Sequence, residues 1–457
     1  MSASSKSFLK RSLEKASDLE HRQKINYNIG KYNAVVPIGK QQFTNLDAIR
    51  NLANAKKAAS IERLHENLLL FEKKIEGRGA KVIWAENSND ALAAILKICR
   101  EKQCRTVVKS KSMVTEEIHL NAFLESQGIK SVETDLGEYI QQLDGEPPYH
   151  IVTPAMHKSK EDVAKLFFEK LGTPINSSPE ELTLVARKKL RHAYVAAEVG
   201  VTGANFIVAD SGAIVVTENE GNARLSSSFP KTHIVIAGIE KLIEKLEDLA
   251  LFLPLLSTFG TGQRVTVYNS IISGPGQNDE ADGPTDMYVI LLDNGRTNLL
   301  ADVKARQSLY CIRCGACLNA CPVYKNIGGH TYATTYSGPV GSVITPHLKQ
   351  HEYQHLSFAS SLCGNCTSVC PVKIELHELL LYNRNISVKS GNSSLAERIA
   401  WKAWKQASLS RSMMNMANGN IKDKVVNRIF GGWNKHRGDL QFSSKTFNQL
   451  WKERNRE

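Results

Sequence analysis

Seven cysteines between residues 311 and 370 constrain this chain more than any other feature of its sequence. The first run reads Cys311-Ile-Arg-Cys314-Gly-Ala-Cys317-Leu-Asn-Ala-Cys321-Pro322, and the second reads Cys363-Gly-Asn-Cys366-Thr-Ser-Val-Cys370-Pro371. The C-x2-C-x2-C-x3-C-P spacing of the first run is typical of thiolate ligands to iron–sulfur clusters. Two-residue gaps allow a short loop to wrap one cluster, and the proline stops the chain from folding back over it. We therefore expect an iron–sulfur module here.

The order of the cysteines predicts which of them share a cluster. In proteins with two clusters, the fourth cysteine of such a run binds the other cluster. We expect cluster 1, a [4Fe-4S] cluster, to be held by Cys311, Cys314, Cys317 and Cys370, and cluster 2 by Cys321, Cys363 and Cys366. Cluster 2 lacks one thiolate, because Ser360 stands where the second run would be completed. It is therefore either a [3Fe-4S] cluster, or a [4Fe-4S] cluster with a non-cysteine ligand or an open iron.

Zinc and disulfide bonds are the alternatives for these cysteines. Four-cysteine zinc sites also use C-x2-C pairs, but seven cysteines do not divide into sets of four. Cysteines at ligand spacing indicate a reducing compartment, where disulfides are rare. The N-terminus has no apolar segment of a secretory signal, and the best apolar run, Leu249–Leu256, is far shorter than the ~18 residues of a membrane helix. We expect a cytoplasmic protein, with a peripheral contact to the membrane left open.

Strands alternate with helices over residues 65–300. Apolar segments at 81–85, 105–109, 130–134 and 233–237 predict strands, and helical spacing appears at 89–99 and 116–127. This alternation predicts an α/β domain with a parallel sheet. Further expectations are a long helix from Pro179 with a Ser178 cap, a strand pair around Gly212, Gly-rich loops at 260–263 and 273–278, and strands at 265–268 and 288–292. Cys99 and Cys104 are interpreted as core residues of this domain.

The remaining segments are predicted to be mostly helical. Residues 1–64 form a polar N-terminal arm, residues 301–390 the cluster domain, and residues 391–457 a basic tail with Trp401, Trp404, Trp433 and Trp451. Residues 332–346 are rich in Gly, Thr and Ser and have no regular period. From residue 401 onward, twelve Lys/Arg stand against four Asp/Glu, a net charge of +8 within the chain's +12. The tail is suited to docking on an acidic partner or an anionic membrane, or its tryptophans serve only in helix packing.

Two further segments narrow the comparison with known proteins. Lys109-Ser-Lys-Ser-Met-Val-Thr-Glu-Glu117 and Ala209-Asp-Ser-Gly-Ala-Ile-Val-Val-Thr-Glu218 precede the cysteine runs, which resemble the two-cluster modules of glycolate oxidase and heterodisulfide reductase subunits. The whole order of parts resembles the lactate utilisation protein B family, with a LUD-type domain similar in fold to CoA transferases and ribose-5-phosphate isomerases. The resemblance implies an iron–sulfur member of a three-protein L-lactate oxidising system, with two partner subunits and an electron acceptor at or near the membrane.

Polar residues of the α/β domain are candidates for one pocket: Lys109, Lys111, Glu218, Asn222, Arg224 and the loop at 260–262. A carboxylate substrate such as lactate needs a cation and a base near its hydroxyl carbon. The segment Glu218-Asn-Glu220-Gly is similar to the Ser-Glu-Asn-Gly motif of CoA transferases, whose Glu is a nucleophile. Glu218, Lys109 and Arg224 are therefore the catalytic candidates, and the alternative is a polar loop without chemistry. No dinucleotide fingerprint surrounds Gly274-Pro-Gly276, so no NAD or flavin is inferred.

Charged residues and histidines flank the cysteine runs. Arg313, Lys325 and Lys373 would raise a cluster potential by stabilising its reduced form, unless they are only solvated surface. His347, His351 and His355 are spaced for one face of a helix, so one of them is a candidate for the missing ligand of cluster 2 or a structural residue.

Three functions fit these observations. The first is an electron-transfer subunit of an L-lactate oxidising system, which is a redox subunit rather than a complete enzyme. The second is an enzyme of acyl or CoA transfer with structural clusters. The third is an iron–sulfur protein that binds nucleic acid, suggested by the net charge of +12. Nucleic acid is not expected as a partner, because the chain lacks the interleaved aromatic and basic residues of a recognised reader.

Overall fold

The structure is a computed structural model that describes residues 3–277, 280, 282–349, 352–392, 395–416, 418–429 and 438–455. The chain divides into two compact units, residues 2–387 and residues 388–457. The domain boundaries suggested by the sequence at residues 64, 300 and 390 stay predictions. In the described ranges, no helix is both long enough and apolar enough to cross a membrane.

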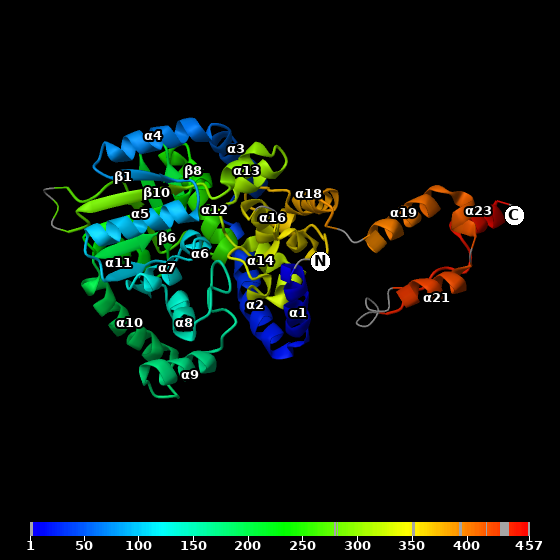
Figure 1. Ribbon diagram of the computed structural model, residues 1–457, viewed down its shortest axis with the longest axis horizontal. Helices are drawn as coiled ribbons and strands as arrows, with labels where there is room; N and C mark the ends of the chain where they lie inside the picture. Colours follow the sequence, from blue (N-terminus) through cyan, green and yellow to red (C-terminus); the bar gives the residue numbers. More distant parts are fainter. Residues whose placement is uncertain are drawn as a thin grey trace. The chain divides into compact units, whose positions relative to one another are not determined.

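A six-stranded sheet forms the centre of the first unit (Figure 1). Its strands, in spatial order, are β1 (Lys81–Ala85), β10 (Asp286–Leu292), β7 (Thr232–Gly238), β4 (Val199–Thr202), β2 (Thr106–Lys109) and β3 (Lys130–Glu133). Every neighbouring pair is parallel. Ile234 and Ile290 face one core, while Val235 and Val289 face the other, because successive side chains point to opposite faces of a sheet. The predicted α/β fold with a parallel sheet is confirmed.

Helices cover both faces of this sheet. One core packs the sheet against α5 (Ser88–Glu101), α6 (Met113–Glu117) and α7 (Leu120–Ser126). The sequence predicts one helix over 116–127, but His119 has a φ of 55°, so the chain breaks between α6 and α7. Helix α10 (Pro179–Ala196) begins as predicted, with Ser178 and Glu181 forming a reciprocal capping box. Helices α8 (Leu136–Asp144) and α9 (Lys160–Leu171) precede it.

A second, four-stranded sheet has the order β8 (Leu242–Ile243), β5 (Phe206–Val208), β6 (Ala213–Glu218) and β9 (Tyr268–Ile272). The predicted strand pair is confirmed, since β5 and β6 pair antiparallel across a turn where Gly212 has a φ of 62°. The strand predicted at 265–268 is wrong, because pairing with β6 begins only at Tyr268. The Gly-rich loop predicted at 260–263 is also wrong in part, because α12 (Leu249–Thr261) runs through Gly260 and ends at Gly262, with a φ of 77°.

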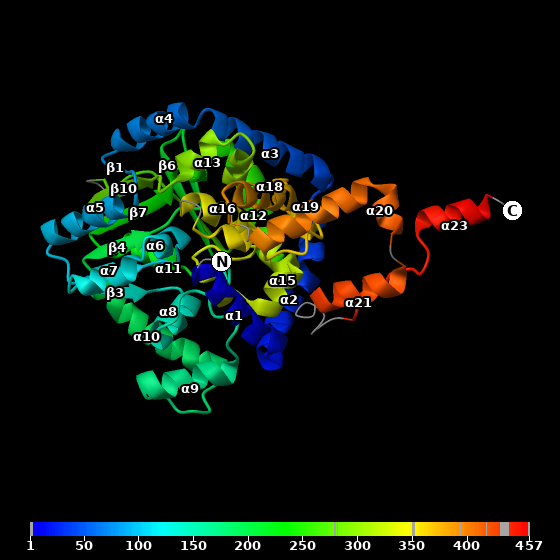
Figure 2. The ribbon, with the colours of Figure 1, turned by 45° about the vertical axis from the view of Figure 1, so that its right-hand side comes forward.

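The N-terminal arm consists of α1 (Ala3–Ser17), α2 (Leu19–Lys40) and α3 (Leu46–Glu62), and α4 (Leu64–Glu76) follows it. Ile25, Ile29 and Phe71 are fully or almost fully buried in the same core as the cysteine segment. Figure 2 shows α1 and α2 beside the helix Pro322–Ile327 that follows the first cysteine run, whereas α3 contacts the 3-10 helix Ala305–Tyr310 that precedes this run. The arm is therefore ordered against the body of the protein.

The cysteine segment is mostly helical, as predicted. Its helices are α13 (Arg296–Ala301), α14 (Ala316–Ala320), α15 (Pro322–Ile327), α16 (Gly338–Leu348), α17 (Asn365–Ser368) and α18 (Leu376–Lys389). Helix α16 lies in the segment for which the sequence shows no regular period. The period is missing because residues 338–347 are all buried, so the helix has no polar face that would repeat along the sequence. The second unit is helical, with α19 (Leu395–Leu409), α20 (Arg411–Asn415), α21 (Gly419–Ile429) and α23 (Phe447–Arg454). Trp433 lies outside the described residues.

Candidate functional site

The structure brings the seven cysteines together in two groups. The thiolates of Cys311, Cys314, Cys317 and Cys370 interact electrostatically with one another. Cys321, Cys363 and Cys366 form the second group. Cys363 is exposed, whereas the first group is almost entirely buried. One group is largely buried and the other reaches the surface. The assignment of these cysteines to two clusters by the crossed pairing of the runs stays a prediction.

The backbone of the two cysteine loops is the same and suits an anionic cluster. Arg313 and Gly315 have φ values of 61° and 80°, and Leu362 and Gly364 have φ values of 56° and 79°. A backbone of this kind turns successive N–H groups into a concave anion site, as in many iron–sulfur proteins. The amides of Arg313, Tyr324 and Ile374 each lie 3.4 Å from a cysteine Sγ, those of Cys311, Cys321 and Cys370. These residues therefore fit iron–sulfur clusters.

Ser360 occupies the place in the second loop that Cys311 occupies in the first. The amide of Arg313 donates to Cys311 Sγ at 3.4 Å, and the amide of Leu362 donates to Ser360 Oγ at 3.1 Å. Each acceptor lies two residues before its donor, within the same left-handed turn. The hydroxyl of Ser360 is therefore the structural counterpart of a ligand thiolate.

Burial disfavours a bare thiolate at these positions. It raises the pKa of Cys366 to about 11 and that of Cys370 to about 12. A buried thiolate needs a compensating positive charge, which bound iron supplies. The donor set thus has the chemistry of a metal site rather than that of free thiols.

Buried cations surround the first cysteine group, and sequence analysis found only one of them. Lys57, Lys241 and Arg313 each interact electrostatically with Cys311. Lys57 Nζ donates to the carbonyls of Glu240 at 2.7 Å and Leu242 at 2.9 Å. Burial lowers the pKa of Lys57 to about 7 and that of Lys241 to about 8. No local pattern marks Lys57, which comes from α3 in the N-terminal arm.

The other two predicted cations have different environments. Lys373 forms an ion pair with Asp47 at 2.7 Å. Lys325 lies near Cys321, where burial raises the pKa of the thiol and the charge of Lys325 opposes this rise only in part. Of the three predicted cations, only Arg313 belongs to the buried cations around Cys311. Its guanidinium lies 4.5 Å from the centre of the Tyr336 ring.

A cavity of about 230 Å³ lies between the α/β domain and the first cysteine loop. Segments that follow β2, β3 and β4 contribute to its wall, and carboxyl ends of parallel strands are the usual ligand sites of α/β proteins. The predicted residues Lys111, Glu218, Asn222 and Gly260 line it. The opposite wall carries Arg313, Cys314 and Tyr336. The cavity therefore joins the two parts of the molecule that carry candidate chemistry.

Lys109 and Arg224 do not line this cavity. Lys109 is fully buried, and its Nζ lies 2.7 Å from Glu133 and 2.9 Å from Glu116. Arg224 is exposed, with its guanidinium 6.0 Å from the centre of the Tyr268 ring. The geometry thus separates both residues from the site that sequence analysis assigned to them.

Glu218 lines the cavity, but its carboxylate is engaged. Its two oxygens accept the amides of Ala223 at 2.6 Å and Arg224 at 2.8 Å, so it caps α11 (Asn222–Ser228). Glu220, which sequence analysis quoted only as part of a motif, also lines the cavity. The Glu220 side chain is exposed, and its partial desolvation together with the neighbouring Asp135 raises its pKa to about 7. Glu220 is therefore better placed than Glu218 to exchange a proton near neutral pH.

The predicted histidine helix does not form. Helix α16 ends at Leu348, and His355 belongs to a separate 3-10 helix, Gln354–Phe358. The buried His347 Nε2 lies 2.9 Å from Asn383 Oδ1, and the His355 ring lies 5.5 Å from that of Phe8. The expectation of one helical face is wrong because the helix that holds His347 ends at Leu348, before His355. His351 lies outside the described residues.

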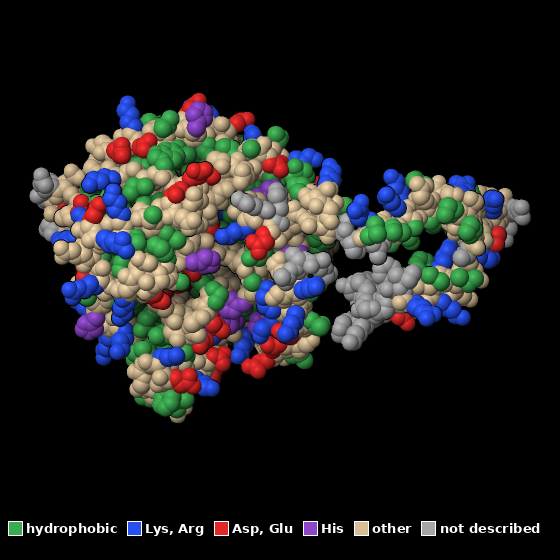
Figure 3. Space-filling model, viewed as in Figure 1, with side chains coloured by type: hydrophobic (Ala, Val, Ile, Leu, Met, Phe, Trp, Pro, Cys, Tyr) green, Lys and Arg blue, Asp and Glu red, His purple; other side chains and the backbone are tan. Residues whose placement is uncertain are grey.

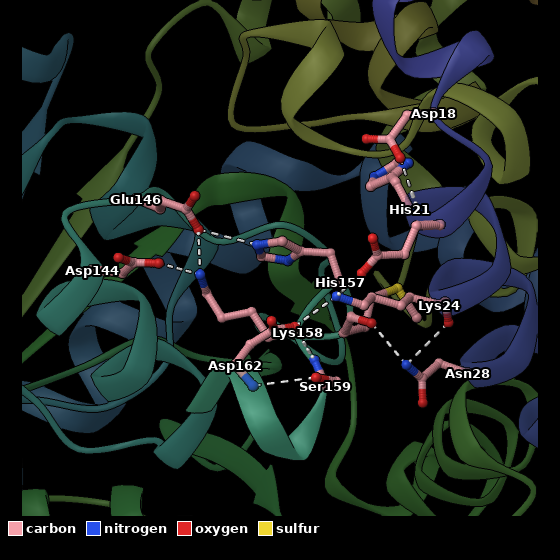
Figure 4. A network of polar contacts seen from close by, with 12 residues as sticks. Asp18, His21, Lys24, Asn28, Asp144, Glu146, His157, Lys158, Ser159 and Asp162 are labelled. Carbon is pink, nitrogen blue, oxygen red and sulfur yellow. Dashed lines mark hydrogen bonds and ion pairs between the residues drawn. The ribbon is translucent and has the colours of Figure 1, made fainter. Parts of the chain in front are cut away.

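A second polar network joins the N-terminal arm to the α/β domain (Figure 4). His157 Nε2 lies 3.0 Å from Glu146 Oε2, and the Lys158 ammonium donates to the same oxygen at 3.1 Å. Lys24 of α2 pairs with Asp162 at 2.8 Å. Glu146, His157 and His330 bring their ligand atoms within 4.8 Å, but the Lys158 ammonium already supplies the positive charge there. We interpret this network as structural.

The comparisons with known proteins agree with this architecture. Residues 68–292 match the LUD domain family, and residues 307–374 match the 4Fe-4S dicluster domain family. A relative from Geobacillus sp. (strain WCH70), called Lactate utilization protein B, is 43% identical and aligns over 80% of this chain and 77% of its own length. Relatives of the same name from Anoxybacillus flavithermus (strain DSM 21510 / WK1) and Bacillus cereus (strain AH820) are 42% and 43% identical. They align over 85% and 82% of this chain and over 82% and 80% of their own lengths.

One solved structure also aligns with the chain. It is a DUF162 family protein from Deinococcus radiodurans, with 14% identity and a TM-score of 0.29, covering 50% of this chain and 98% of that chain. At this TM-score the alignment supports no statement about the fold.

The fold and the paired cysteine loops define an iron–sulfur protein in which a LUD domain is followed by a 4Fe-4S dicluster domain. The sequence identity of 42–43% to relatives over most of their length also shows the family. The chain belongs to the lactate utilization protein B family.

Proposed function

We propose that this chain is the iron–sulfur electron-transfer subunit of a system that oxidises L-lactate to pyruvate. It acts with two partner subunits and delivers electrons to an acceptor at or near the membrane. The observation that carries the proposal is the arrangement of the two thiol groups. One is buried beside a cavity, and the other includes the exposed Cys363, where a partner can approach.

The ligands follow from the grouping of the thiols. Cys311, Cys314, Cys317 and Cys370 hold a [4Fe-4S] cluster, and Cys321, Cys363 and Cys366 hold the second cluster. Such clusters, when bound, take up and release single electrons. Lys57, Lys241 and Arg313 place positive charge beside the first group, which favours the more negative reduced state and therefore raises its potential.

The second cluster is of the [3Fe-4S] type, or it has four irons with Ser360 Oγ or an open iron at the fourth position. The position of Ser360 supports these alternatives for the fourth ligand, because its hydroxyl accepts the hydrogen bond from the Leu362 amide that a ligand thiolate would accept. Histidine is a weaker candidate for the ligand, since His347 is hydrogen-bonded to Asn383.

Electron paramagnetic resonance with iron and sulfide quantitation tests these assignments. Anaerobically purified protein is expected to give a three-iron signal when oxidised and a four-iron signal after dithionite reduction. Ser360→Cys should convert the three-iron signal to a second four-iron signal, while the neighbouring Ser361→Cys should not. Two four-iron signals in the wild type would assign the fourth position to a non-cysteine ligand or an open iron. Zinc without iron would refute the electron-transfer proposal.

The other two functions have less support. An acyl-transfer nucleophile needs a free carboxylate, whereas both oxygens of Glu218 accept backbone amides. Nucleic-acid binding is suggested by the net charge of +12, but the tail from residue 401 carries +8 of it, which leaves +4 for residues 1–400. On the face shown in Figure 3, Lys/Arg and Asp/Glu side chains are interspersed over the first unit. Lactate-dependent reduction of an acceptor only when all three subunits are combined would support a redox subunit, and turnover by this chain alone would support an enzyme.

A further inference from the structure

We propose that the cavity between the α/β domain and the first cysteine loop binds a short 2-hydroxycarboxylate. Its carboxylate lies at Arg313 and Lys241, and its hydroxyl group faces Glu220. This inference rests on the proposed function, and it assigns substrate binding to this chain rather than to a partner subunit.

Two buried polar atoms on the cavity wall carry the proposal. Arg313 Nη1 and Ser110 Oγ are buried, and among the described residues neither has a hydrogen-bond partner. The side chain of Arg313 is 10% exposed and Ser110 is 1% exposed. A buried donor without a partner is destabilising, so such atoms in a cavity indicate a ligand that pairs with them.

Lys241 adds a second cation to the same wall. It is 8% exposed, and its ammonium interacts electrostatically with Glu240 and Cys311. Lys111, by contrast, also lines the cavity but donates to the carbonyl of Val152 at 2.9 Å. Arg313 Nη2 pairs with Glu240 at 3.4 Å, which leaves Nη1 as the unused donor of the guanidinium. This donor and the nearby Lys241 ammonium favour a carboxylate, which accepts charge-assisted hydrogen bonds.

The wall also offers an acceptor for a hydroxyl group. Glu218 has both oxygens occupied by amides, whereas Glu220 uses only Oε2, which accepts the amide of Leu136 at 3.1 Å. Glu220 Oε1 therefore stays available for a donor in the ligand. A group that combines a carboxylate with a neighbouring hydroxyl satisfies both kinds of partner, which a simple carboxylic acid does not.

The size of the cavity limits the ligand to a small molecule. Pockets for drug-sized ligands measure about 300–1,000 Å³, and this cavity measures about 230 Å³. A coenzyme A thioester or a dinucleotide is too large to be enclosed. The presence of Cys314 on the wall puts the ligand beside a proposed cluster ligand, as expected for a substrate that gives up electrons.

Isothermal titration calorimetry of the anaerobically purified, iron-loaded chain tests this site. L-lactate is expected to bind with one-to-one stoichiometry. Propionate, which lacks the hydroxyl group, should bind at least tenfold more weakly, and lactamide, which lacks the negative charge, should not bind measurably. Equal binding of lactate and lactamide, or no heat with lactate, would overturn the proposal.

Two variants assign the residues. Lys241→Met should weaken lactate at least tenfold, while the matched Lys245→Met should not, because the Lys245 ammonium is exposed and pairs with Glu247 at 3.4 Å. Glu220→Gln should weaken lactate but leave propionate unchanged. Equal affinities of the Lys241→Met and Lys245→Met proteins would refute the carboxylate position. Iron content and the resonance signals of each variant are measured in parallel. Full cluster content without lactate binding would refute this site alone, whereas loss of clusters in the wild type would refute the proposed function.

Discussion

Replacing Lys109 by Met is expected to destabilise the protein strongly, although the side chain touches no candidate ligand site. Its Nζ lies 2.7 Å from Glu133 Oε1, 2.9 Å from Glu116 Oε1 and 3.8 Å from Glu138 Oε2. Burial alone would lower the pKa of Lys109, but these carboxylates raise it above its ordinary value. The variant therefore leaves buried carboxylates without their only close cation among the described residues.

The magnitude follows from the cost of protonating Glu133. Burial already raises the pKa of Glu138 well above its ordinary range, and Glu116 is partly exposed, so Glu133 is the group that must take up a proton. Holding a carboxyl of ordinary pKa protonated at pH 7 costs about 3.7 kcal/mol, at about 1.36 kcal/mol for each pH unit. This is an upper limit, because burial already raises the pKa of Glu133 in the wild type. This agrees with the about 3–5 kcal/mol found when one partner of a buried ion pair is removed.

The stability difference between the Lys109→Met variant and the wild type should depend on pH. An acid whose pKa is raised by folding loses stability as the pH rises, so the variant is weakest relative to wild type at pH 7. At pH 5 the same proton costs only about 1 kcal/mol, so the difference should shrink by up to about 2.7 kcal/mol. The free energy of unfolding is measured by urea titration at both pH values.

Two controls separate this effect from the loss of any lysine. Lys111→Met removes a lysine two residues away whose Nζ bonds only the Val152 carbonyl, and should cost less than about 2 kcal/mol. In the double variant, Glu133→Gln should restore much of the stability that Lys109→Met loses. An equal loss at pH 5 and pH 7, or no rescue by Glu133→Gln, would refute the electrostatic reasoning.

Three further predictions concern other parts of the chain. Cys370→Ser should lose about half of the bound iron in an iron assay, since one group of ligands is broken, while Cys104→Ser, a core residue at 8% exposure, should keep all of it. Gly200→Ala should lower the urea midpoint, because the new Cβ would lie 1.8 Å from the Ser226 carbonyl oxygen, and an unchanged midpoint would contradict this contact. The hydrogen bond from His157 and the Lys158 ammonium lower the pKa of Glu146 to about 2, so its stabilisation exists above the ordinary Glu pKa and disappears as the pH falls through about 2. Glu146→Gln should therefore melt below wild type at pH 7 but level with it near pH 2, and a constant difference would count against the ion network.

Local patterns predicted much of this fold. The strands β1, β2, β3 and β7 and the helix after Ser178 follow from apolar periodicity and capping, which act over a few residues. The cysteine spacing predicted an iron–sulfur module, which the match of residues 307–374 to the 4Fe-4S dicluster domain family supports, because ligand loops are local structures. Helix α16 was missed for the opposite reason, since burial on every side removes the polar face that a period needs.

The chemistry around the loops depended on distant contacts. Lys109 and Lys111 are two residues apart, and nothing in the local sequence distinguishes them. Yet Lys109 is buried in the core, whereas Lys111 lines the cavity. Lys57 reaches the first cysteine group from a helix more than two hundred residues earlier in the chain, and no spacing rule connects them. The sequence therefore indicated Arg313, Lys111 and Glu218 at the site, but not Lys57 or Lys241.

The contact between α3 and the second cysteine run has a consequence for biosynthesis. Arg50 donates to the Cys370 carbonyl at 2.7 Å, across 320 residues of chain, and Asn54 donates to the Val372 carbonyl at 2.8 Å. At about 5–20 residues per second, translation needs about 16–64 s to cover that distance. During this interval the early helices exist without their partner, and the four ligands of the first cluster are not yet all made. Iron insertion and docking of the arm thus fall in the same late window of synthesis, when the emerging chain most needs protection from aggregation.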